Sequence, residues 1–479
     1  MRHVSVGALA LVLMAISACS GSDDSSGKKP EDKLVGAIGV QLSETALFQG
    51  PKRTLMIGGQ AGEGVPLVQG RDALFRAYYS TNADYDGEAV LATLDLLDGQ
   101  PPIEKALILG PGSSDADLGS TINFEIPGSR IKETFQYSLS MVQFDNGRGD
   151  NQFARFAQQV AVAGKPNKLR ILIVPYAYNA DGSGRVPDTS EEQVERYRER
   201  FRSLYPVSDV EVSVHAPVPW SSPIQPNGYG WQEVGLNLFG IRGSEGIPPD
   251  TYLYGVFNPT ASIGQFCGGG CLLGVTLLND NPPDEGSVSL RLALGVGFPQ
   301  VALNTAAHEI GHAHGRRHAN CGPGLEPQSI DSQYPHANGR IGDWGYDITN
   351  GDLHDPAVAT DIMSYCDNQF ISGYNYTSLF ARGQNVNSPK IIGAPADYWI
   401  VASDGLGSTR WQKTRFAGIP SGQEVEVTVD TSSASGLVSK AWYTPYDHLD
   451  GGWLFLPASV GEITRIEHAA GGARQVLRR

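Results

Sequence analysis

Four histidines and one glutamate lie within eleven residues and restrict how this part of the chain can fold. The segment 308–318 has the sequence His-Glu-Ile-Gly-His-Ala-His-Gly-Arg-Arg-His. His308 and His312 are four residues apart, so on an α-helix they lie on one face, one turn apart. Gly315 can take a left-handed conformation that ends the helix and turns the chain toward His318. The pattern therefore predicts a helix, a tight turn and three converging imidazoles.

These residue types suit a metal ion. Two imidazoles one turn apart can share a cation, and three histidines with an open fourth position are typical of catalytic zinc sites. Glu309 follows the first histidine and can reach a water molecule on the metal. We therefore predict that His308, His312 and His318 bind one Zn²⁺ and that Glu309 is a general base. His314 should face away from the metal, at the surface or behind the ligands.

The extended motif resembles the signature of the metzincin metalloproteases, His-Glu-x-x-His-x-x-Gly-x-x-His. That family also has a Met-turn, whose methionine lies under the metal. The segment Asp361–Cys366, with the sequence DIMSYC, fits this turn, and Met363 follows His318 by forty-five residues. In astacin-like and serralysin-like metzincins a tyrosine two residues after the methionine approaches the zinc. The resemblance implies that Tyr365 has this position and stabilises the oxyanion of the reaction.

The resemblance covers about residues 168–390 and implies an activity. Within the family, this chain resembles most the exported bacterial proteases that include mucin-cleaving enzymes, because of its MSYC turn and the insert Tyr334–Asp347. We expect this aromatic, glycine-rich insert to shape the cleft. The implied function is zinc-dependent hydrolysis of peptide bonds in extracellular proteins or glycoproteins. No cysteine lies in a plausible pro-segment, so latency through a thiol is not supported.

Other interpretations of the motif stay open. The chain could be a surface lipoprotein that binds glycan or protein, with a structural or inactive zinc site, although such a site has no need of Glu309. A zincin of another clan would use a distant glutamate as third ligand, but His318 stands at the matching offset. The acidic stretch Asn279–Asp284 has side chains that suit calcium, yet a turn needs the same residues, so calcium is unsupported.

The N-terminus has the pattern of an export signal. Val4–Ile16 is apolar but shorter than the ~20 residues that span a membrane. Small residues then precede Cys19, which resembles a bacterial lipoprotein signal that is cut before an acylated cysteine. We therefore predict a signal peptide over 1–18 and a flexible tether over 19–34. Ser20 after the cysteine favours anchoring in the outer membrane or at the cell surface.

The charge balance excludes one class of partner. Lys and Arg number 36 against 51 Asp and Glu, which gives a net charge of −15. Nucleic-acid binding needs a basic surface, so no nucleic acid is expected. The expected partners are a protein or glycoprotein substrate and a membrane reached through the lipid on Cys19. We expect the chain to be a monomer.

Four further cysteines in an exported chain predict two disulfides. Three pairings exist, and we favour Cys267–Cys271 and Cys321–Cys366. The first closes a glycine-rich loop, and the second ties together the two ends of the motif region. The strand that ends near Leu278 is a candidate edge strand, which could align an extended substrate. The first disulfide would stiffen the start of that strand.

The chain divides into three folded regions. Short strand-like runs separated by turn signals predict a β-sandwich over 35–165. Alternating strands and helices predict an α/β region over 166–392. Short strands return in a small β-rich region over 393–479. We thus expect an α/β (α+β) metzincin-like catalytic domain flanked by β-rich N- and C-terminal domains.

Helix signals are strongest in three places. Ser190 and Gln193 form a capping-box start, and Pro206 ends that helix. Trp231–Ile241 predicts a weaker helix, because its glycines lower the propensity. A third helix starts from about Pro299 and carries the histidines. The strands predicted in the α/β region are Leu169–Val174, Val210–Val214, Tyr252–Phe257, Cys271–Leu278 and Val288–Leu294.

Overall fold

The structure is a computed structural model, and it is a strand-rich α+β fold with 42% strand and 18% helix. No helix in the part of the chain that it describes is long and apolar enough to cross a membrane. The predicted signal peptide, Cys19 and the acidic stretch Asn279–Asp284 lie outside the described residues. The described residues are 33–145, 156–161, 164–278, 288–322, 325, 329–388, 394–405, 407–417, 419–420, 422–470 and 473–479.

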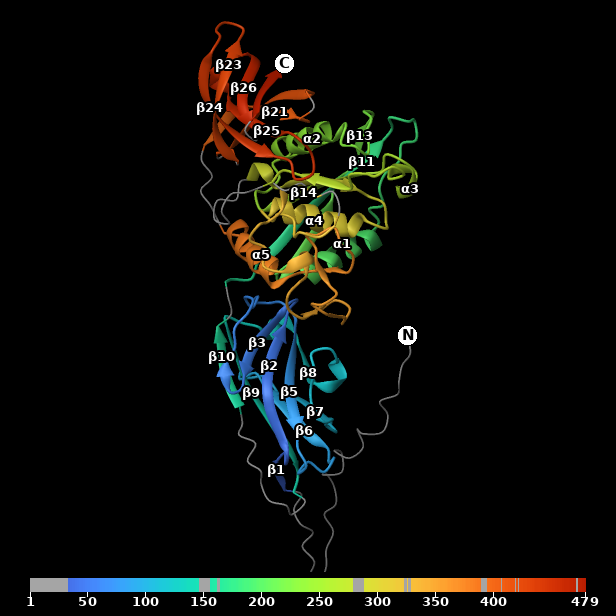
Figure 1. Ribbon diagram of the computed structural model, residues 1–479, viewed down its shortest axis with the longest axis vertical. Helices are drawn as coiled ribbons and strands as arrows, with labels where there is room; N and C mark the ends of the chain where they lie inside the picture. Colours follow the sequence, from blue (N-terminus) through green and yellow to red (C-terminus); the bar gives the residue numbers. More distant parts are fainter. Residues whose placement is uncertain are drawn as a thin grey trace, which may run out of the picture.

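The N-terminal region is a sandwich of two five-stranded antiparallel sheets (Figure 1). One sheet has the order β1-β9-β6-β7, with β10 paired to β9, and the other has the order β4-β3-β2-β5-β8. Phe75, Phe124 and Tyr137 come from both sheets and share one buried cluster, so the two sheets pack face to face. The strands are β1 Leu34–Gly36, β2 Val40–Phe48, β3 Lys52–Ile57, β4 Gln60–Ala61, β5 Ala73–Thr81, β6 Val90–Asp95, β7 Ile103–Leu107, β8 Ile122–Ile126, β9 Thr134–Phe144 and β10 Phe156–Ala161.

The central region contains a six-stranded sheet with the order β12-β11-β14-β16-β15, and β13 also pairs with β11. All of its pairs are parallel except the pair of β15 with β16, so β15 is an antiparallel edge strand, as predicted. Residues 288–290, predicted as strand, form a 3₁₀ turn instead. The strands are β11 Lys168–Tyr178, β12 Asp209–Val214, β13 Val218–Trp220, β14 Thr251–Phe257, β15 Gly274–Thr276 and β16 Leu292–Val296.

Helices cover both faces of the central sheet. Ser190 caps α1 by accepting a bond from the Gln193 amide, which confirms the predicted start. Residues of α1, α4 and α5 bury their apolar sides in one cluster with β11 and β14, whereas α2 packs in a second cluster on the opposite side. The helices are α1 Glu191–Leu204, α2 Trp231–Ser244, α3 Ile263–Phe266, α4 Ala302–Ala313 and α5 Gly373–Val386.

The insert after the histidine motif contacts the N-terminal sandwich. The Lys52 amide donates to the Trp344 carbonyl at 2.8 Å, and the Tyr346 amide donates to the Gly50 carbonyl at 2.8 Å. Buried Arg71 adds a second tie, because its guanidinium donates to the Val207 carbonyl beyond α1 at 3.1 Å. Four short strands lie in or near the insert: β17 Gly345–Tyr346, β18 Leu353–His354, β19 Thr360–Asp361 and β20 Gln369–Phe370.

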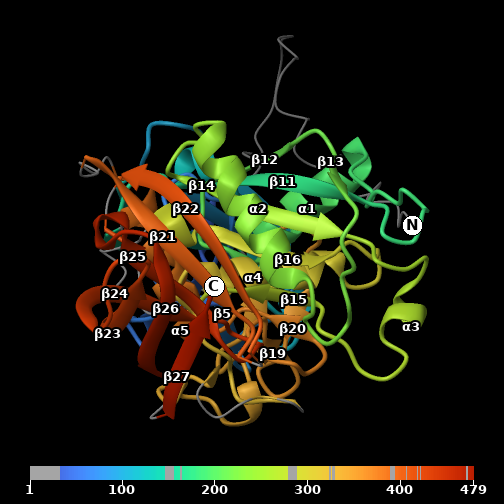
Figure 2. The ribbon, with the colours of Figure 1, turned by 90° about the horizontal axis from the view of Figure 1, so that it is seen from above.

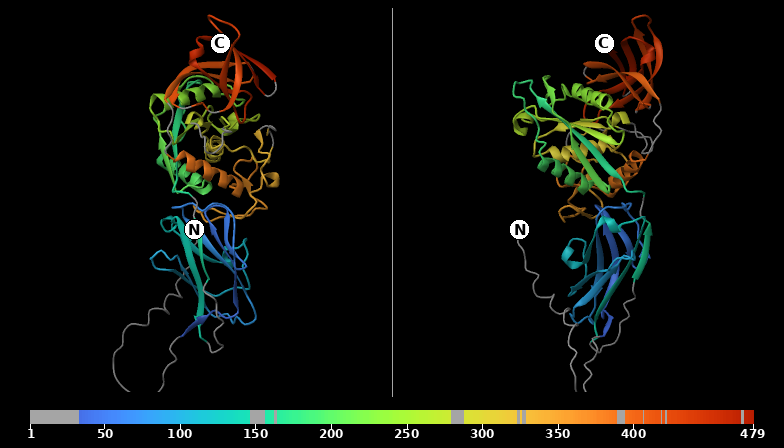
Figure 3. Two further views of the ribbon diagram at one scale, coloured as in Figure 1. Left: turned by 90° about the vertical axis from the view of Figure 1, so that its left-hand side faces the viewer. Right: turned by 180° about the vertical axis from the view of Figure 1, so that it is seen from behind.

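The C-terminal region is one seven-stranded antiparallel sheet with the order β22-β21-β25-β24-β23-β26-β27. The three regions follow one another along the long axis of the molecule (Figure 3). The strands are β21 Pro395–Ser403, β22 Thr409–Ala417, β23 Gln423–Thr431, β24 Leu437–Pro445, β25 Gly452–Pro457, β26 Ile463–Ala470 and β27 Ala473–Arg478.

This sheet is packed against the central region and shares its core. Phe239 of α2 lies 5.7 Å from Trp453 and 6.3 Å from Phe455, measured between ring centroids. The ring centroid of Phe416 of β22 lies 5.8 Å from that of Phe239. Figure 2 shows β21 and β22 beside α2. Apolar packing of this kind holds the C-terminal sheet in a fixed place beside the central sheet. The loop between β24 and β25 therefore reaches the histidine motif from a defined direction.

Candidate metal centre

Helix α4 and the turn after it bring the three motif histidines together. Gly315 adopts a φ of +87°, and the Arg316 amide bonds back to the Gly311 carbonyl at 3.0 Å, which closes the helix end. The chain then reverses and returns His318 to the helix. Nε2 of His312 lies 3.0 Å from Nε2 of His308 and 3.0 Å from Nε2 of His318. The predicted helix, turn and convergence are all present.

The outer ring nitrogens show which atoms face the centre. Nδ1 of His308 donates to the Ile362 carbonyl at 2.8 Å, and Nδ1 of His312 donates to the Arg316 carbonyl at 2.6 Å. Nδ1 of His318 lies 3.0 Å from the Ser329 hydroxyl. A carbonyl oxygen only accepts, so at His308 and His312 the proton is on Nδ1 and the Nε2 lone pair points inward. Converging lone pairs of this kind repel one another unless a cation lies between them.

Burial keeps these imidazoles neutral, as metal ligands must be. Burial lowers the pKa of His308 well below its usual value, and the neighbouring His312 lowers it further. Burial lowers the pKa of His312 to about 4. The pKa of His318 is lowered in the same way, first by burial and then by the other two histidines. A buried group of uncharged nitrogen donors is ready to hold a metal ion.

The turn at Met363 supports the histidine helix from below. Met363 is fully buried, and a Cβ added at Gly311 would lie 2.5 Å from its Sδ, so the two pack without room for a side chain. Asp361 holds the turn, accepting from the Met363 amide at 2.8 Å and from the Ser372 amide at 2.9 Å. Because Ile362 accepts from His308, this turn also orients the first ligand.

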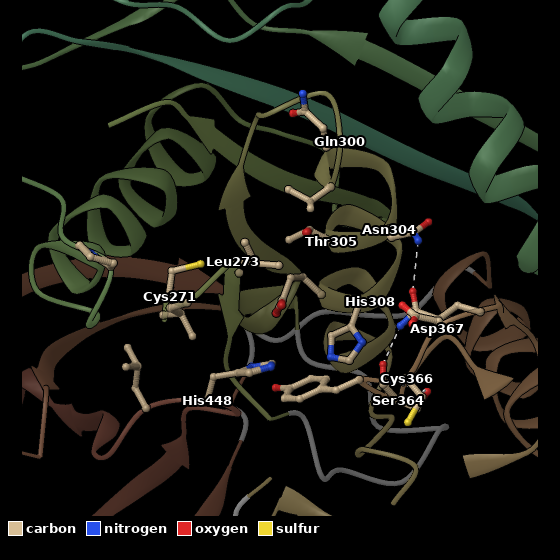
Figure 4. A pocket seen from close by; sticks show the side chains of 18 of the residues that line it. Cys271, Leu273, Gln300, Asn304, Thr305, His308, Ser364, Cys366, Asp367 and His448 are labelled. Carbon is tan, nitrogen blue, oxygen red and sulfur yellow. Dashed lines mark hydrogen bonds between the residues drawn. The ribbon is translucent and has the colours of Figure 1, made fainter. Parts of the chain in front are cut away.

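A fourth imidazole enters the centre from the C-terminal sheet. Nε2 of His448 lies 3.3 Å from Nε2 of His318, and the ligand atoms of all four histidines lie within 4.8 Å of one another. Nδ1 of His448 bonds the carboxylate of Asp447, whose Oδ2 is 3.5 Å from Nε2 of His312. In Figure 4 the His448 ring points from the C-terminal strands toward His308.

Sequence reasoning missed Asp447 and His448. His448 stands 130 residues after His318 in the sequence, and Asp447 precedes it, within a segment that predicts only short strands. Neither residue belongs to a local motif. No local signal identifies them, because only the packing of the C-terminal sheet on α2 brings their loop to the site.

Glu309 lies beside the histidines in a desolvated position. Its side chain is buried against Gly274 of β15, and its Oε2 has no hydrogen-bond partner among the described residues. Burial raises the pKa of Glu309 well above its usual value, and the nearby charge of Asp447 raises it further. Burial by itself would raise the pKa of Asp447, but the contacts of its carboxylate with the His448 and His312 rings lower it. The orphaned Oε2 is placed to take a hydrogen bond from a small polar ligand at the centre.

Tyr365 stands next to the ligands. Its ring centroid is 5.0 Å from that of His318 and 5.5 Å from that of His448, with which it is stacked. Its amide donates to the Cys321 carbonyl at 2.9 Å, beside the Cys321–Cys366 disulfide. Burial raises the pKa of the Tyr365 hydroxyl, so it remains a neutral hydrogen-bond donor. Its role toward the oxyanion stays a prediction.

A cleft of about 700 Å³ opens over the centre, with His308 and Glu309 at its floor. One wall is the segment 271–274, which leads into β15, and the other is the segment 364–369 (Figure 4). The prediction that the insert Tyr334–Asp347 shapes the cleft is wrong, because none of its residues belongs to the described lining. The insert is held against the N-terminal sandwich instead.

Both favoured disulfides are present, Cys267–Cys271 and Cys321–Cys366. The first closes the loop that leads into the β15 wall. The second joins the chain just after His318 to the opposite wall of the cleft. Two disulfides indicate folding in an oxidising compartment outside the cytosol.

His314 faces away from the metal centre, as expected, but the prediction that it could lie at the surface is wrong. Its side chain is buried, and its ring stacks on Tyr252 at 4.3 Å. Its Nδ1 bonds the Ile310 carbonyl at 2.8 Å. The side of α4 opposite the ligands packs on the central sheet, so a residue there is in the core.

No protein-family model and no curated protein sequence matches this chain.

Proposed function

We propose that this protein is a zinc-dependent endopeptidase of the metzincin type. The observation that carries the proposal is the convergence of three Nε2 atoms, from His308, His312 and His318, beside the buried Glu309 carboxylate at the floor of a cleft. The nitrogen-to-nitrogen distances of 3.0 Å are near the edge of about 3.3–3.4 Å expected for tetrahedral zinc. The packing of Met363 under α4 supports the family resemblance.

Each residue of the centre has a chemical task under this proposal. Zinc, when bound, supplies a Lewis acid that lowers the pKa of water toward about 7 and polarises a carbonyl group. The charge of a bound zinc would offset the raised pKa of Glu309 and favour its ionised form, so that its unpaired Oε2 takes the proton from the attacking water and then delivers it to the leaving nitrogen. The Tyr365 hydroxyl donates to the oxygen that becomes negative as the carbonyl is attacked.

The cleft suits an extended polypeptide. The segment 271–274, which leads into the antiparallel edge strand β15, forms one wall, and the backbone of this edge could add a substrate strand. Gly274 of this strand packs directly on Glu309, so a chain paired there passes over the catalytic carboxylate. The substrate class we propose is an extracellular protein or glycoprotein. Anchoring through a lipid on Cys19, in the outer membrane or at the cell surface, would place the enzyme beside such substrates.

The test uses the protein from Lys33 onward and its Glu309→Ala variant, each loaded with one equivalent of zinc. Casein and a mucin-type glycoprotein are the substrates, with and without a chelator. We expect the wild type alone to cut at least one of them, and the chelator to abolish cleavage. The matched control is Glu245→Ala, which removes an exposed glutamate at the end of α2 and should keep wild-type activity.

Cleavage that survives in Glu309→Ala or in chelator would contradict the mechanism. A second candidate function is a surface lipoprotein that binds glycan or protein, with a structural metal site. His448 favours it, because four imidazoles fill a closed site of the structural kind. Bound zinc without cleavage, in the wild type and also after removal of the His448 side chain, would favour that second function.

A further inference from the structure

The loop between β24 and β25 lies along the edge strand of the central sheet. The Leu278 amide donates to the Pro445 carbonyl at 2.9 Å, and the Asp447 amide donates to the Thr276 carbonyl at 3.2 Å. Between these bonds Leu277 and Tyr446 form an antiparallel bridge. The segment 445–447 therefore extends the sheet beyond β15 and occupies the edge where a substrate strand would pair.

This segment divides the space along β15. The cleft of about 700 Å³ ends at His448 and Leu449, and a second cavity of about 440 Å³ lies on the other side of the loop. Residues 445–450 line the second cavity together with Arg317 and Asp404. Displacement of the loop would join both cavities into one groove that follows the edge strand.

The same pairing aims the next side chains at the metal centre. Oδ1 of Asp447 accepts from the Thr276 amide at 2.9 Å, and its other oxygen holds Nδ1 of His448. Nε2 of His448 then lies 3.3 Å from Nε2 of His318. The Asp447 side chain is wholly inaccessible, whereas that of His448 is 12% exposed.

All four imidazoles are oriented in one way. Each directs Nε2 to the centre and has an oxygen at Nδ1, from Ile362, Arg316, Ser329 and Asp447 respectively. A histidine that binds a metal typically bonds a carboxylate, carbonyl or water through its second nitrogen, which fixes the ring and raises its basicity. His448 has the strongest of these partners, a buried carboxylate.

We propose that His448 is a fourth, displaceable metal ligand, and that the segment Pro445–His448 holds the enzyme closed by occupying the position of a substrate strand on β15. With His448 in place, four nitrogens would fill the shell of a bound zinc and leave no position for water, so the wild type cleaves only in the fraction of molecules whose segment has left the edge strand. Activity requires that the segment leaves the edge strand. The latency rests on the proposed endopeptidase function, whereas the ligand role of His448 does not.

The first test counts ligands without any substrate. X-ray absorption at the zinc edge should report four imidazoles in the wild type and three in His448→Ala, with an oxygen replacing the fourth. The zinc dissociation constant, measured by chelator competition, should rise at least about tenfold. Asp447→Asn keeps an oxygen for the Thr276 amide but removes the carboxylate from His448, and should weaken zinc binding by a smaller factor.

The control is His215→Ala, because this histidine lies after β12, at the opposite edge of the central sheet, and pairs with Glu245. It should change neither the ligand count nor the zinc affinity. Circular dichroism checks that each variant is folded. An unchanged ligand count in folded His448→Ala would overturn the assignment of His448, whether or not the protein is a protease.

The second test measures closure of the centre. Acetohydroxamate, a small zinc-binding ligand, is titrated into the cobalt-substituted protein and followed in the visible spectrum. It must displace His448 in the wild type, so His448→Ala should bind it at least about tenfold more tightly. Equal affinities in the two proteins would overturn the proposed closure.

The third test links closure to proteolysis. Casein cleavage by His448→Ala at saturating zinc should be faster than by the wild type, while His215→Ala stays at the wild-type rate. Slower casein cleavage by His448→Ala than by the wild type would overturn the proposed latency and make His448 part of the catalytic machinery. If the ligand count and acetohydroxamate affinity change as expected but no variant cleaves any substrate, the metal assignment is supported and the endopeptidase function fails.

Discussion

Substitution of Gly311 by alanine tests whether contact with Met363 controls the metal centre. Gly311 lies within α4, between Glu309 and His312. Alanine in a helix interior is ordinarily more stable than glycine by about 0.8–1.0 kcal/mol. Here the added Cβ would lie 2.5 Å from Sδ of Met363 and 3.6 Å from the Tyr205 hydroxyl. The helix gain is therefore opposed by a steric overlap.

The steric overlap at least cancels the stability gained from the alanine in the helix. Carbon and sulfur need a separation of well over 3 Å, so Met363 must move by on the order of 1 Å. Overpacking of a buried site costs about 1–3 kcal/mol. After subtraction of the helix gain, we expect a net destabilisation of about 0–2 kcal/mol. Gly240→Ala is the matched control, because its Cβ meets only Gln412 at 3.8 Å and should stabilise α2 by about 0.5–1 kcal/mol.

The displacement should also reach the ligands. Met363 follows Ile362, whose carbonyl holds Nδ1 of His308 at 2.8 Å, and its own carbonyl accepts from the Ala319 amide at 2.9 Å, next to His318. Loss of a bond that orients a metal-binding histidine typically weakens metal affinity by about 10–100-fold. We expect a loss of that size in Gly311→Ala and none in Gly240→Ala.

Two assays check these expectations. Urea unfolding followed by tryptophan fluorescence measures stability, and chelator competition measures zinc affinity. If Gly311→Ala is as stabilising as Gly240→Ala and leaves zinc affinity unchanged, then Met363 does not support the centre as described.

Two further predictions concern residues outside the ligand set. Replacing Cys321 and Cys366 by serine should destabilise the protein by about 4 kcal/mol, because this disulfide joins residues 45 apart in the sequence. Replacing Cys267 and Cys271 by serine should cost only about 2 kcal/mol, because these residues are four apart. Equal urea midpoints for the two double variants would contradict this order. Burial lowers the pKa of His314 to about 3. Below pH 6.5 its imidazole is therefore protonated in the unfolded chain but neutral in the folded chain. Stability should fall by about 1.4 kcal/mol per pH unit from this residue between pH 6.5 and 3, and His314→Phe should make the acid-induced loss shallower by that slope in urea titrations at fixed zinc concentration. An unchanged slope would show that His314 is not held neutral.

Much of the metal centre could be predicted because it is local. His308, Glu309 and His312 share one helix turn, and Gly315 supplies the left-handed residue that returns His318. Helix periodicity and the conformational freedom of glycine are properties of short segments, so a sequence expresses them directly. The capping of α1 by Ser190 was predicted for the same reason.

Other features depend on which surfaces meet in space. The helix periodicity of α4 indicated that His314 faces away from the ligands, but only its packing on Tyr252 shows that this side is core. The insert Tyr334–Asp347 was expected at the cleft, and its contacts with the N-terminal sandwich draw it elsewhere. In both cases the sequence pattern of a short segment was readable locally, but the part of the protein against which that segment packs was not.

The sequence by itself determined the three histidines, the adjacent carboxylate and the turn that carries Met363. Only the tertiary structure decided that Asp447 and His448 join them. The physical reason is that their position depends on apolar contacts between Phe239 of α2 and aromatic rings of the C-terminal sheet, such as that of Trp453. Trp453 lies more than 130 residues after the histidine motif in the sequence. Such packing is not directional along the chain, and no spacing rule encodes it.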